Sequence, residues 1–442
     1  MPGQARIGSR TGSPIRIGRR DQRRESRIPV GVNQFIGVIS WALASVALAA
    51  PAPNSFAVQG VRIFDGEKSH AHANVVVIDG RVAAVGPGVR IPKDLQIVDG
   101  VGKTLLPGFL DAHVHVFPGA QSDALRFGVT TEFDMFNVTH DFEQWRRQRE
   151  SLGRVTQADT WSAGIGVTVP GGHPVQWVPE NMPRLTRDAS AGEFVAARIG
   201  EGSDYIKLIV EDNAVLDPAH AIPTLTPAQA CAVIAAARAR GKLTVAHVTS
   251  QSNALMAIDC HVHGLAHTFV DGPAGEELLR RAREEGVFFI STLALLASPL
   301  EPPATAGAWM SVGQARSLRM SNPLVHPGDF ANAVESIRRL HTAGVPVLAG
   351  TDAPAPGTAH GITLHRELAI LVQSGLTPEE ALASATALPA RAFGLADRGR
   401  VSPGARADLV LVDGDPTVNI SDTLRIAMIW KNGYAVDRTA PR

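Results

Sequence analysis

The chain has 442 residues with 42 basic and 42 acidic side chains, so no net charge directs it toward nucleic acid or an acidic partner. This length is about three times that of a typical domain and predicts two or three folding units, or one large barrel with additions. The two cysteines are too few for a disulfide framework. We expect Cys231 to be a buried thiol within an Ala-rich helix.

The first 52 residues differ from the rest of the chain. Residues 1–29 contain eight arginines and no lysine, an apolar segment covers residues 35–50, and Pro51-Ala52-Pro53 follows. This order predicts a basic region and a secretory signal peptide, with export to the periplasm, cleavage near residues 50–53, and no stable membrane span afterwards. An uncleaved anchor or a disordered basic arm is the alternative, and the paired arginines favour the twin-arginine route only weakly.

Both ends of the remaining chain have the character of small antiparallel sheets. Residues 53–106 alternate short β-rich runs with turns, and Asp79-Gly80 between two apolar runs is typical of a hairpin. Residues 399–442 contain two further β-rich runs. We therefore predict that the two ends combine into one small β-sandwich domain.

The middle of the chain, residues 107–398, alternates short β-rich runs with helical stretches. Eight such units predict a (β/α)8 TIM barrel, whose chemistry lies at the carboxyl ends of its strands. Helices are expected between the strands, with Thr226-Pro227 and Thr377-Pro378 as capped starts. The predicted strands are residues 104–116, 129–136, 160–168, 204–211, 242–249, 263–270, 286–295 and 344–352.

Polar side chains at five of these strands predict a metal site. The first strand ends in two histidines one residue apart, which project to the same face if the segment is extended. Histidine, lysine and aspartate follow along four further strands, and each residue taken alone has a structural alternative, such as a surface pair, a satisfied core histidine or a helix cap. The set in fixed order favours a metal centre. Its members are His113, His115, Lys207, His247, His267 and Asp352.

The motifs that carry these residues resemble the amidohydrolase superfamily, near its imidazolonepropionase- and prolidase-like branch of binuclear metal-dependent hydrolases. The resemblance covers about residues 58–437. It rests on PGFLDAHVH at 107–115, DYIKL at 204–208, AHVTS at 246–250, LAHTF at 265–269, GTDA at 350–353, TPEEALASAT at 377–386 and GRVSPGARADLVLVD at 399–413.

The resemblance implies two divalent metal ions, with zinc favoured and manganese, cobalt or iron left open. His113, His115 and Asp352 would hold the more buried ion, and His247 and His267 the second. An ammonium group has no lone pair, so Lys207 must lose a proton or be converted to a group with oxygen lone pairs, and the resemblance implies a carbamate that bridges the two ions. Hydrolysis would proceed by attack of a hydroxide shared by the two metals, with Asp352 as the proton shuttle.

The implied reaction is cleavage of an amide bond in a small molecule, with a dipeptide or an N-acyl amino acid as the leading substrate. An organophosphate, carbamate or lactone hydrolase on the same site is the alternative. A deaminase is less favoured, because deaminases of this superfamily typically use one metal and lack the lysine. A non-catalytic member would lack some of the six ligands. We also expect a homo-oligomer and no nucleic-acid partner.

Three residues are weaker candidates for contact with the substrate. His173, in the loop after the third strand, is predicted to polarise the carbonyl or bind substrate, with a structural role in the loop as the alternative. Tyr205 lies two residues before Lys207 on the same predicted face, and a role in filling the barrel is the alternative. His360 follows the eighth strand and is a candidate for contact with substrate or with a ligand.

Overall fold

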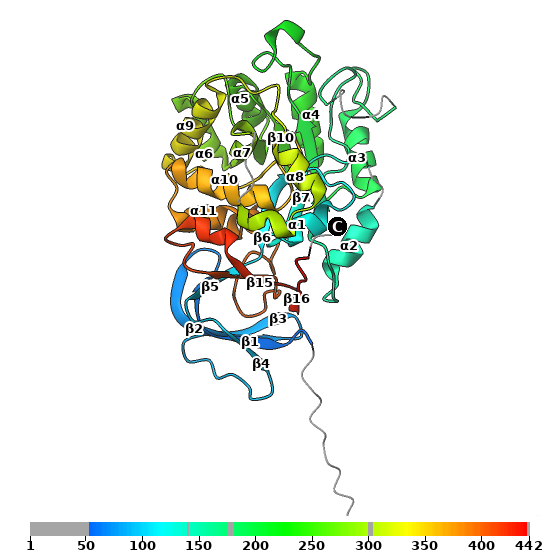
Figure 1. The fold of residues 1–442 in the computed structure, drawn as a ribbon. Coiled ribbons are helices and arrows are strands. Elements are labelled where there is room, and N and C mark those ends of the chain that lie inside the picture. The colour runs from blue at the N-terminus through cyan, green and yellow to red at the C-terminus, as the bar shows by residue number, and fades with distance from the viewer. Residues whose placement is uncertain (1–52, 139–140, 175–177, 179–180, 299–303, 440–442) are drawn as a thin grey trace, which may run out of the picture. The chain divides into compact units, whose positions relative to one another are not determined.

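The computed structural model describes residues 53–138, 141–174, 178, 181–298 and 304–439. Residues 50–442 form one compact unit (Figure 1). The basic region and the apolar segment of the predicted signal peptide lie outside the described residues. Within the described ranges, no helix has both the length and the apolar character needed to cross a bilayer.

Both chain ends contribute to one eight-stranded mixed sheet (Figure 1). Its order is β16-β15-β14-β5-β1-β2-β3, and β4 pairs with β1. One face of the sheet packs on an apolar cluster that includes Val58, Leu105 and Trp430. Their bounds are β1 Phe56–Phe64, β2 Ser69–Ile78, β3 Arg81–Gly86, β4 Gln96–Asp99, β5 Lys103–Pro107, β14 Leu409–Asp413, β15 Ile426–Lys431 and β16 Tyr434–Ala435.

The two chain ends join in one sheet, because β5 from the N-terminal part pairs with β14 from the C-terminal part. These strands are antiparallel over five residue pairs, from Leu409↔Pro107 to Asp413↔Lys103. The predicted hairpin joins β2 and β3, and its turn residues Asp79 and Gly80 both have positive φ, which the tight turn requires. A second sheet is not assigned to this part within the described ranges, so the sandwich stays a prediction.

All eight predicted strands of the middle region occur, in shorter form, and they lie parallel to their neighbours. They form a three-stranded sheet, β6-β7-β8, and a five-stranded sheet, β13-β12-β11-β10-β9. Single parallel bridges join Val167 to Leu208 and Val114 to Ala353. The bounds are β6 Phe109–Val114, β7 Val129–Asp134, β8 Asp159–Ser162, β9 Ile206–Ile209, β10 Thr244–His247, β11 Gly264–Ala266, β12 Phe288–Ile290 and β13 Val347–Leu348.

The predicted first strand is two strands separated by Gly108. β5 belongs to the mixed sheet, whereas β6 begins the parallel strands. A Cβ atom at Gly108 would lie 2.3 Å from Oγ1 of Thr130, so only glycine allows the chain to pass this close to β7. The HxH motif therefore follows directly on the point where the chain leaves the mixed sheet.

Helices surround the parallel strands (Figure 1). The predicted starts at Thr226 and Thr377 are both capping boxes with proline at the first helical position. The helices are α1 Ala120–Leu125, α2 Phe142–Glu150, α3 Ala191–Glu201, α4 Pro227–Arg238, α5 Gln251–Asp259, α6 Glu276–Glu285, α7 Leu293–Leu296, α8 Val312–Leu318, α9 Asp329–Thr342, α10 Ile362–Gln373, α11 Pro378–Ser384 and α12 Ala387–Ala392, with short 3-10 turns η1 Pro218–His220, η2 Ala304–Trp309 and η3 Ile420–Leu424.

The prediction for the cysteines is wrong. Cys231 is exposed on α4, and its sulfur is bonded to that of Cys260, which ends α5. The bond closes a loop across a sequence separation of 29 residues and ties neighbouring helices together. Sequence position alone does not reveal it, because the two sulfurs meet only through the packing of α4 beside α5.

Candidate metal centre

The two histidines of the HxH motif converge on one carboxylate. Nε2 of His113 and Nε2 of His115 lie 3.2 and 3.0 Å from Oδ1 of Asp352. One ligand atom from each of these three residues lies within 4.8 Å of the others, a spacing at which they could hold a metal ion. His113 is fully buried on β6, and Asp352 follows β13, so neighbouring parallel segments bring the residues together.

The other predicted ligands lie next to this group. The rings of His113 and His267 are 4.7 Å apart between centroids, and those of His267 and His247 are 4.4 Å apart. His173 continues the series, 5.0 Å from His247. Lys207 lies on β9 among them and is buried. The structure thus brings together all six predicted ligands and His173.

Two of the ligands have a backbone conformation that non-glycine residues rarely adopt. φ is 73° at His267 and 57° at Asp352. Thr292, whose Oγ1 lies 2.9 Å from Nδ1 of His267, has φ of 49°. Such strain is typical of functional sites, where the surrounding structure holds it in place.

Burial keeps the central imidazoles neutral. It lowers the pKa of His113 to about 3, and the charge of Lys207 adds to the effect. Burial and the neighbouring histidines hold the pKa of His267 well below its usual range. A neutral imidazole has a free lone pair, which is the form that binds a metal ion.

The lysine and the aspartate have pKa values suited to the predicted roles. Burial lowers the pKa of Lys207 to about 7, so the amine is partly deprotonated near neutral pH. Burial works against the ionised form of Asp352, but electrostatic interaction with His113 and hydrogen bonds from His113 and His115 hold its pKa well below the usual range.

Unpartnered polar atoms test whether these residues fit a metal. Nζ of Lys207 is buried without a hydrogen-bond partner among the described residues, and Nε2 of His247 is buried with the Glu211 carboxylate 3.5 Å away. A buried polar atom left without a partner costs about 1–3 kcal/mol. A nitrogen-rich set with one carboxylate matches the ligands that zinc takes, so the residues fit a divalent metal.

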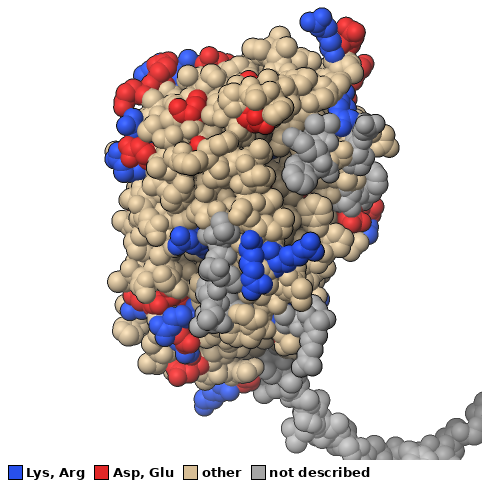
Figure 2. All heavy atoms as spheres, turned by 45° about the horizontal axis from the view of Figure 1, so that its top comes forward, with Lys and Arg blue, Asp and Glu red and all other residues tan. Residues whose placement is uncertain are grey.

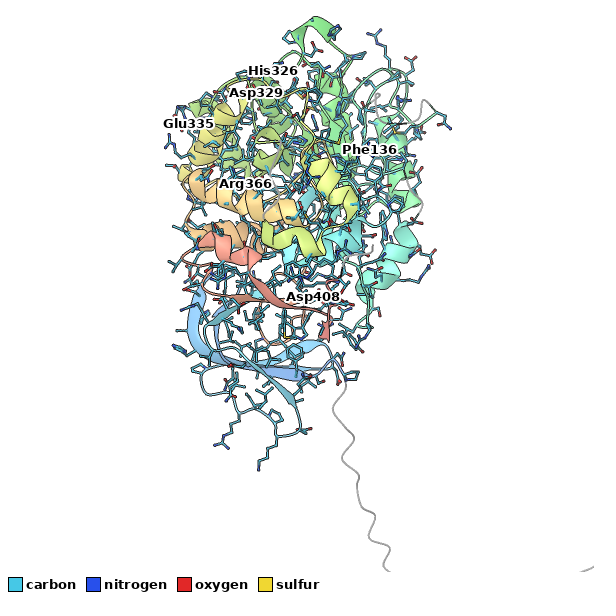
Figure 3. All side chains as sticks on the ribbon, in the orientation of Figure 1. Phe136, His326, Asp329, Glu335, Arg366 and Asp408 are labelled. Atoms are coloured by element: carbon cyan, nitrogen blue, oxygen red, sulfur yellow. A yellow bond between two sulfur atoms is a disulfide. The ribbon has the colours of Figure 1, made fainter. Side chains whose placement is uncertain are left out.

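The centre lies in a cavity of about 820 Å³. All six predicted ligands and His173 line it. Apolar side chains form much of the remaining wall, among them Phe136, which Figure 3 labels in the α/β part. A cavity of this size accommodates a small organic molecule of drug-like dimensions.

Buried carboxylates hold the ligands of the centre in position. The sequence alone does not show which carboxylates have this role. Glu367 of α10 accepts hydrogen bonds from the amides of Leu293 and Ala294 at 2.9 and 2.6 Å, and so fixes the start of α7 next to Thr292. Burial raises the pKa of Glu367 to about 7. Because Thr292 contacts His267, Glu367 positions this ligand through α7.

Asp111 and Glu211 act on the other side of the centre. Asp111 accepts hydrogen bonds from Oγ1 of Thr351 at 2.7 Å and from its amide at 3.1 Å, which joins β6 to the segment that carries Asp352. Glu211 lies 3.5 Å from Nε2 of His247 and accepts a hydrogen bond from Thr249. Their partners are distant in sequence, so only the folded chain reveals these roles.

Two of the weaker candidates do not line the cavity. The Tyr205 hydroxyl donates to the backbone oxygens of Asp134 and Trp161 at 2.8 and 3.3 Å, and the ring packs in the core. Tyr205 shares a face with Lys207 but lies one layer deeper. His360 is buried behind the cavity, where its Nδ1 is 2.6 Å from Oε1 of Glu132. The predicted contact of these two side chains with substrate thus stays a prediction.

Comparisons with known proteins agree with this geometry. The model of the amidohydrolase family matches residues 104–436. The imidazolonepropionase of Mycolicibacterium smegmatis is 26% identical over 388 residues, which is 83% of this chain and 91% of that protein. The imidazolonepropionase of Cutibacterium acnes is 28% identical over 373 residues, covering 77% of this chain and 83% of that protein.

Solved structures show the same fold. A Xaa-Pro dipeptidase with methionine bound in its active site has a TM-score of 0.71 and 20% identity, covering 87% of this chain and all of that one. Molinate hydrolase has a TM-score of 0.68 and 21% identity, covering 87% of this chain and 95% of that one. The chain belongs to the amidohydrolase family. It is a hydrolase that acts on carbon–nitrogen bonds.

Proposed function

We propose that the protein hydrolyses an amide bond of a small molecule at a centre of two divalent metal ions. His113, His115 and Asp352 would hold one ion, His247 and His267 would hold the other, and Lys207 would contribute to both as a carbamate. The observation that carries this proposal is the convergence of six ligand-type side chains on one cavity, with buried neutral imidazoles and a lysine of lowered pKa.

The bound ions would polarise the scissile carbonyl and lower the pKa of a water molecule to about 7. The chain's own residues then direct the protons. The ionised carboxylate of Asp352 takes a proton from the attacking water and delivers it to the nitrogen of the leaving amine. His173 is neutral at pH 7, because burial lowers its pKa to about 3, and its position in the cavity wall supports a role as hydrogen-bond donor to the substrate carbonyl.

We also propose that the eight parallel strands close into a (β/α)8 barrel. The two single bridges support closure, since Val167 pairs with β9 and Val114 pairs with the segment after β13. Closure would bring the histidine ligands and Asp352 to the carboxyl ends of barrel strands, where the chemistry of this fold is found, with Lys207 inside β9. The same proposal assigns residues 107–398 to the barrel domain. It assigns residues 53–106 and 399–442 to the two parts of the β-sandwich domain.

A dipeptide or an N-acyl amino acid remains the substrate that the sequence predicts, and the dipeptidase among the similar structures supports an amide of this kind. An organophosphate, carbamate or lactone is the alternative, with a deaminase less favoured.

A panel assay tests the proposal: zinc-loaded protein is incubated with N-acyl amino acids, dipeptides, neutral amides, a lactone and an aryl phosphotriester. Metal-dependent release of amine from amides is expected, and turnover of the phosphotriester alone would contradict the proposal.

We further propose that the mature protein is periplasmic after cleavage of a signal peptide. The disulfide between Cys231 and Cys260 supports export, because such bonds persist in oxidising compartments and are rare in the cytosol. The exposed position of Cys231 makes this bond accessible to cellular reductants. Assembly into a homo-oligomer stays a prediction, which light scattering on the purified protein would test.

A further inference from the structure

We infer that the substrate is an amide with a bulky apolar group and no free carboxylate near the scissile bond. The inference rests on the proposed amide hydrolysis and narrows it, because it disfavours dipeptides and N-acyl amino acids. Hydrolysis adds one water across the C–N bond, so the acyl carbon gains an OH group and the nitrogen gains a proton. A carboxylate elsewhere in the substrate would need its own partner in the cavity.

The cavity wall offers no cationic side chain for such a carboxylate. Among the described lining residues, Lys207 is the sole lysine, and arginine is absent. The short internal segments outside the described residues, 139–140, 175–177, 179–180 and 299–303, contain neither lysine nor arginine. Lys207 is buried between the histidines and is assigned to the metals, so it is not available as a partner for the substrate.

The histidines do not replace the missing cation. His113 and His267 are buried ligands of the centre, and His247 belongs to the same set. His115 is engaged with the carboxylate of Asp352, 3.0 Å away. His173 is assigned to the scissile carbonyl. The acidic lining residues, Asp141 and Asp352, do not supply a cation either.

Backbone amides at the nearest helix start are also occupied. α7 begins beside Thr292 at the cavity wall. The amides of Leu293 and Ala294 donate hydrogen bonds to the carboxyl group of Glu367. These two amides are therefore not available to a substrate carboxylate.

The remaining wall favours an apolar group. Large uncharged side chains line the cavity from several elements, and uncharged residues cover most of the molecular face in Figure 2. Burial of apolar surface against such a wall stabilises an apolar ligand. The side chains that provide this surface include Met135, Phe136, Trp145, Ile209, Leu295 and Leu296.

A matched pair of substrates tests the inference. N-phenylacetyl-L-phenylalanine and N-phenylacetyl-2-phenylethylamine share the scissile amide and both rings, and they differ only by one carboxylate. For the zinc-loaded full chain we expect kcat/KM to be at least about tenfold higher for the compound without the carboxylate, because an unpaired buried charge is costly. Calorimetry on the zinc-loaded Asp352→Asn variant measures binding apart from turnover. The compound without the carboxylate should again bind more tightly than the acid.

The outcomes separate this inference from the proposed function. Equal or faster hydrolysis of the acid overturns the inference and leaves amide hydrolysis intact. Hydrolysis of neither compound, with tighter binding of the neutral one, contradicts the proposed function and supports the inference. Binding of neither compound overturns the inference.

A variant tests the cause of the preference. Leu295→Arg places a cation at the wall, and Leu295→Met is the matched uncharged control. We expect the arginine variant to shift the ratio of kcat/KM values toward the acid by about tenfold, since a charged hydrogen bond stabilises the bound carboxylate. A folded arginine variant with the ratio of the methionine variant would overturn the inference, because the missing cation would not be the determinant.

Discussion

Lys431 and Asp159 form an ion pair, 2.8 Å from Nζ to Oδ2, in which neither side chain is exposed to solvent. Lys431 ends β15 of the mixed sheet, and Asp159 begins β8 of the parallel strands. Asp408, which Figure 3 places between the sheet and the helices, accepts a second hydrogen bond from Lys431 at 2.7 Å. One ammonium group thus joins both sheets, and its burial makes the pair costly to break.

Lys431→Met should lower the free energy of unfolding by about 3–5 kcal/mol, because two buried carboxylates lose their shared partner. Urea denaturation of the purified protein measures this change. The matched control is Lys103→Met, whose lysine pairs with Asp413 in the same sheet but is partly exposed. We expect a change within about 1 kcal/mol for the control. Equal losses for both variants would contradict the role of burial.

Reloading of the metal-free protein with zinc should require bicarbonate and should become faster as the pH rises through about 7. The pKa of Lys207 is lowered by burial to about 7, and only the neutral amine, which prevails above that pH, forms a carbamate. Activity recovered between pH values of about 6 and 8 and zinc content by mass spectrometry measure the effect.

Lys207→Ala should lose at least one metal per chain and nearly all activity. Full metal content and activity in this variant would rule out the bridging lysine.

Asp352→Asn should reduce kcat by about 10²–10⁴-fold, since the amide cannot accept the proton of the attacking water. KM should change far less, because proton transfer is not part of substrate binding. Steady-state kinetics at matched zinc content separate the two effects. Turnover like that of the wild type would argue against the proton shuttle.

Removal of the disulfide by a combined Cys231→Ser and Cys260→Ser change should lower the free energy of unfolding by about 2–4 kcal/mol, because the unfolded chain gains freedom in the loop. Urea denaturation measures this loss, and the wild type in reductant should denature like the variant. Thiol titration of the denatured wild type offers a direct check. Detection of two free thiols without reductant would contradict the bond.

Protein isolated from its native cells should begin near residues 50–53 if the signal peptide is cleaved. Mass spectrometry of the intact protein identifies this terminus. Residues 35–50 supply the apolar segment that the export machinery would recognise, so a chain that lacks this segment should stay in the cytosol and keep its basic region. A full-length protein that retains Met1 would count against cleavage.

The eight parallel strands were predictable because each is a short apolar run, and the six ligand candidates were predictable because five of these runs carry a histidine, lysine or aspartate. The shared direction of His113 and His115 was predictable as well, since alternate residues of a strand lie on one face. Tyr205 obeys the same rule and is nevertheless outside the cavity. The rule specifies the face of a strand but not the depth of a residue along it.

Other features depend on contacts between distant residues. Glu367 reaches α7 from α10, and Asp111 reaches Thr351 across the parallel strands. The bond between Cys231 and Cys260 likewise arises from the packing of two helices. In the sequence, these residues look like ordinary polar or thiol side chains, because neither their spacing nor their residue type is unusual.

The pairing of β5 with β14 has a consequence for the order in which the protein is made. A growing chain that has reached Asp352 already contains all six proposed ligands, but β14 at Leu409–Asp413 has yet to be synthesised. Until it arrives, β5 has only β1 beside it, and the strand that leads into His113 lacks its antiparallel partner. We therefore expect metal uptake to follow completion of the chain, as one of the last events in maturation.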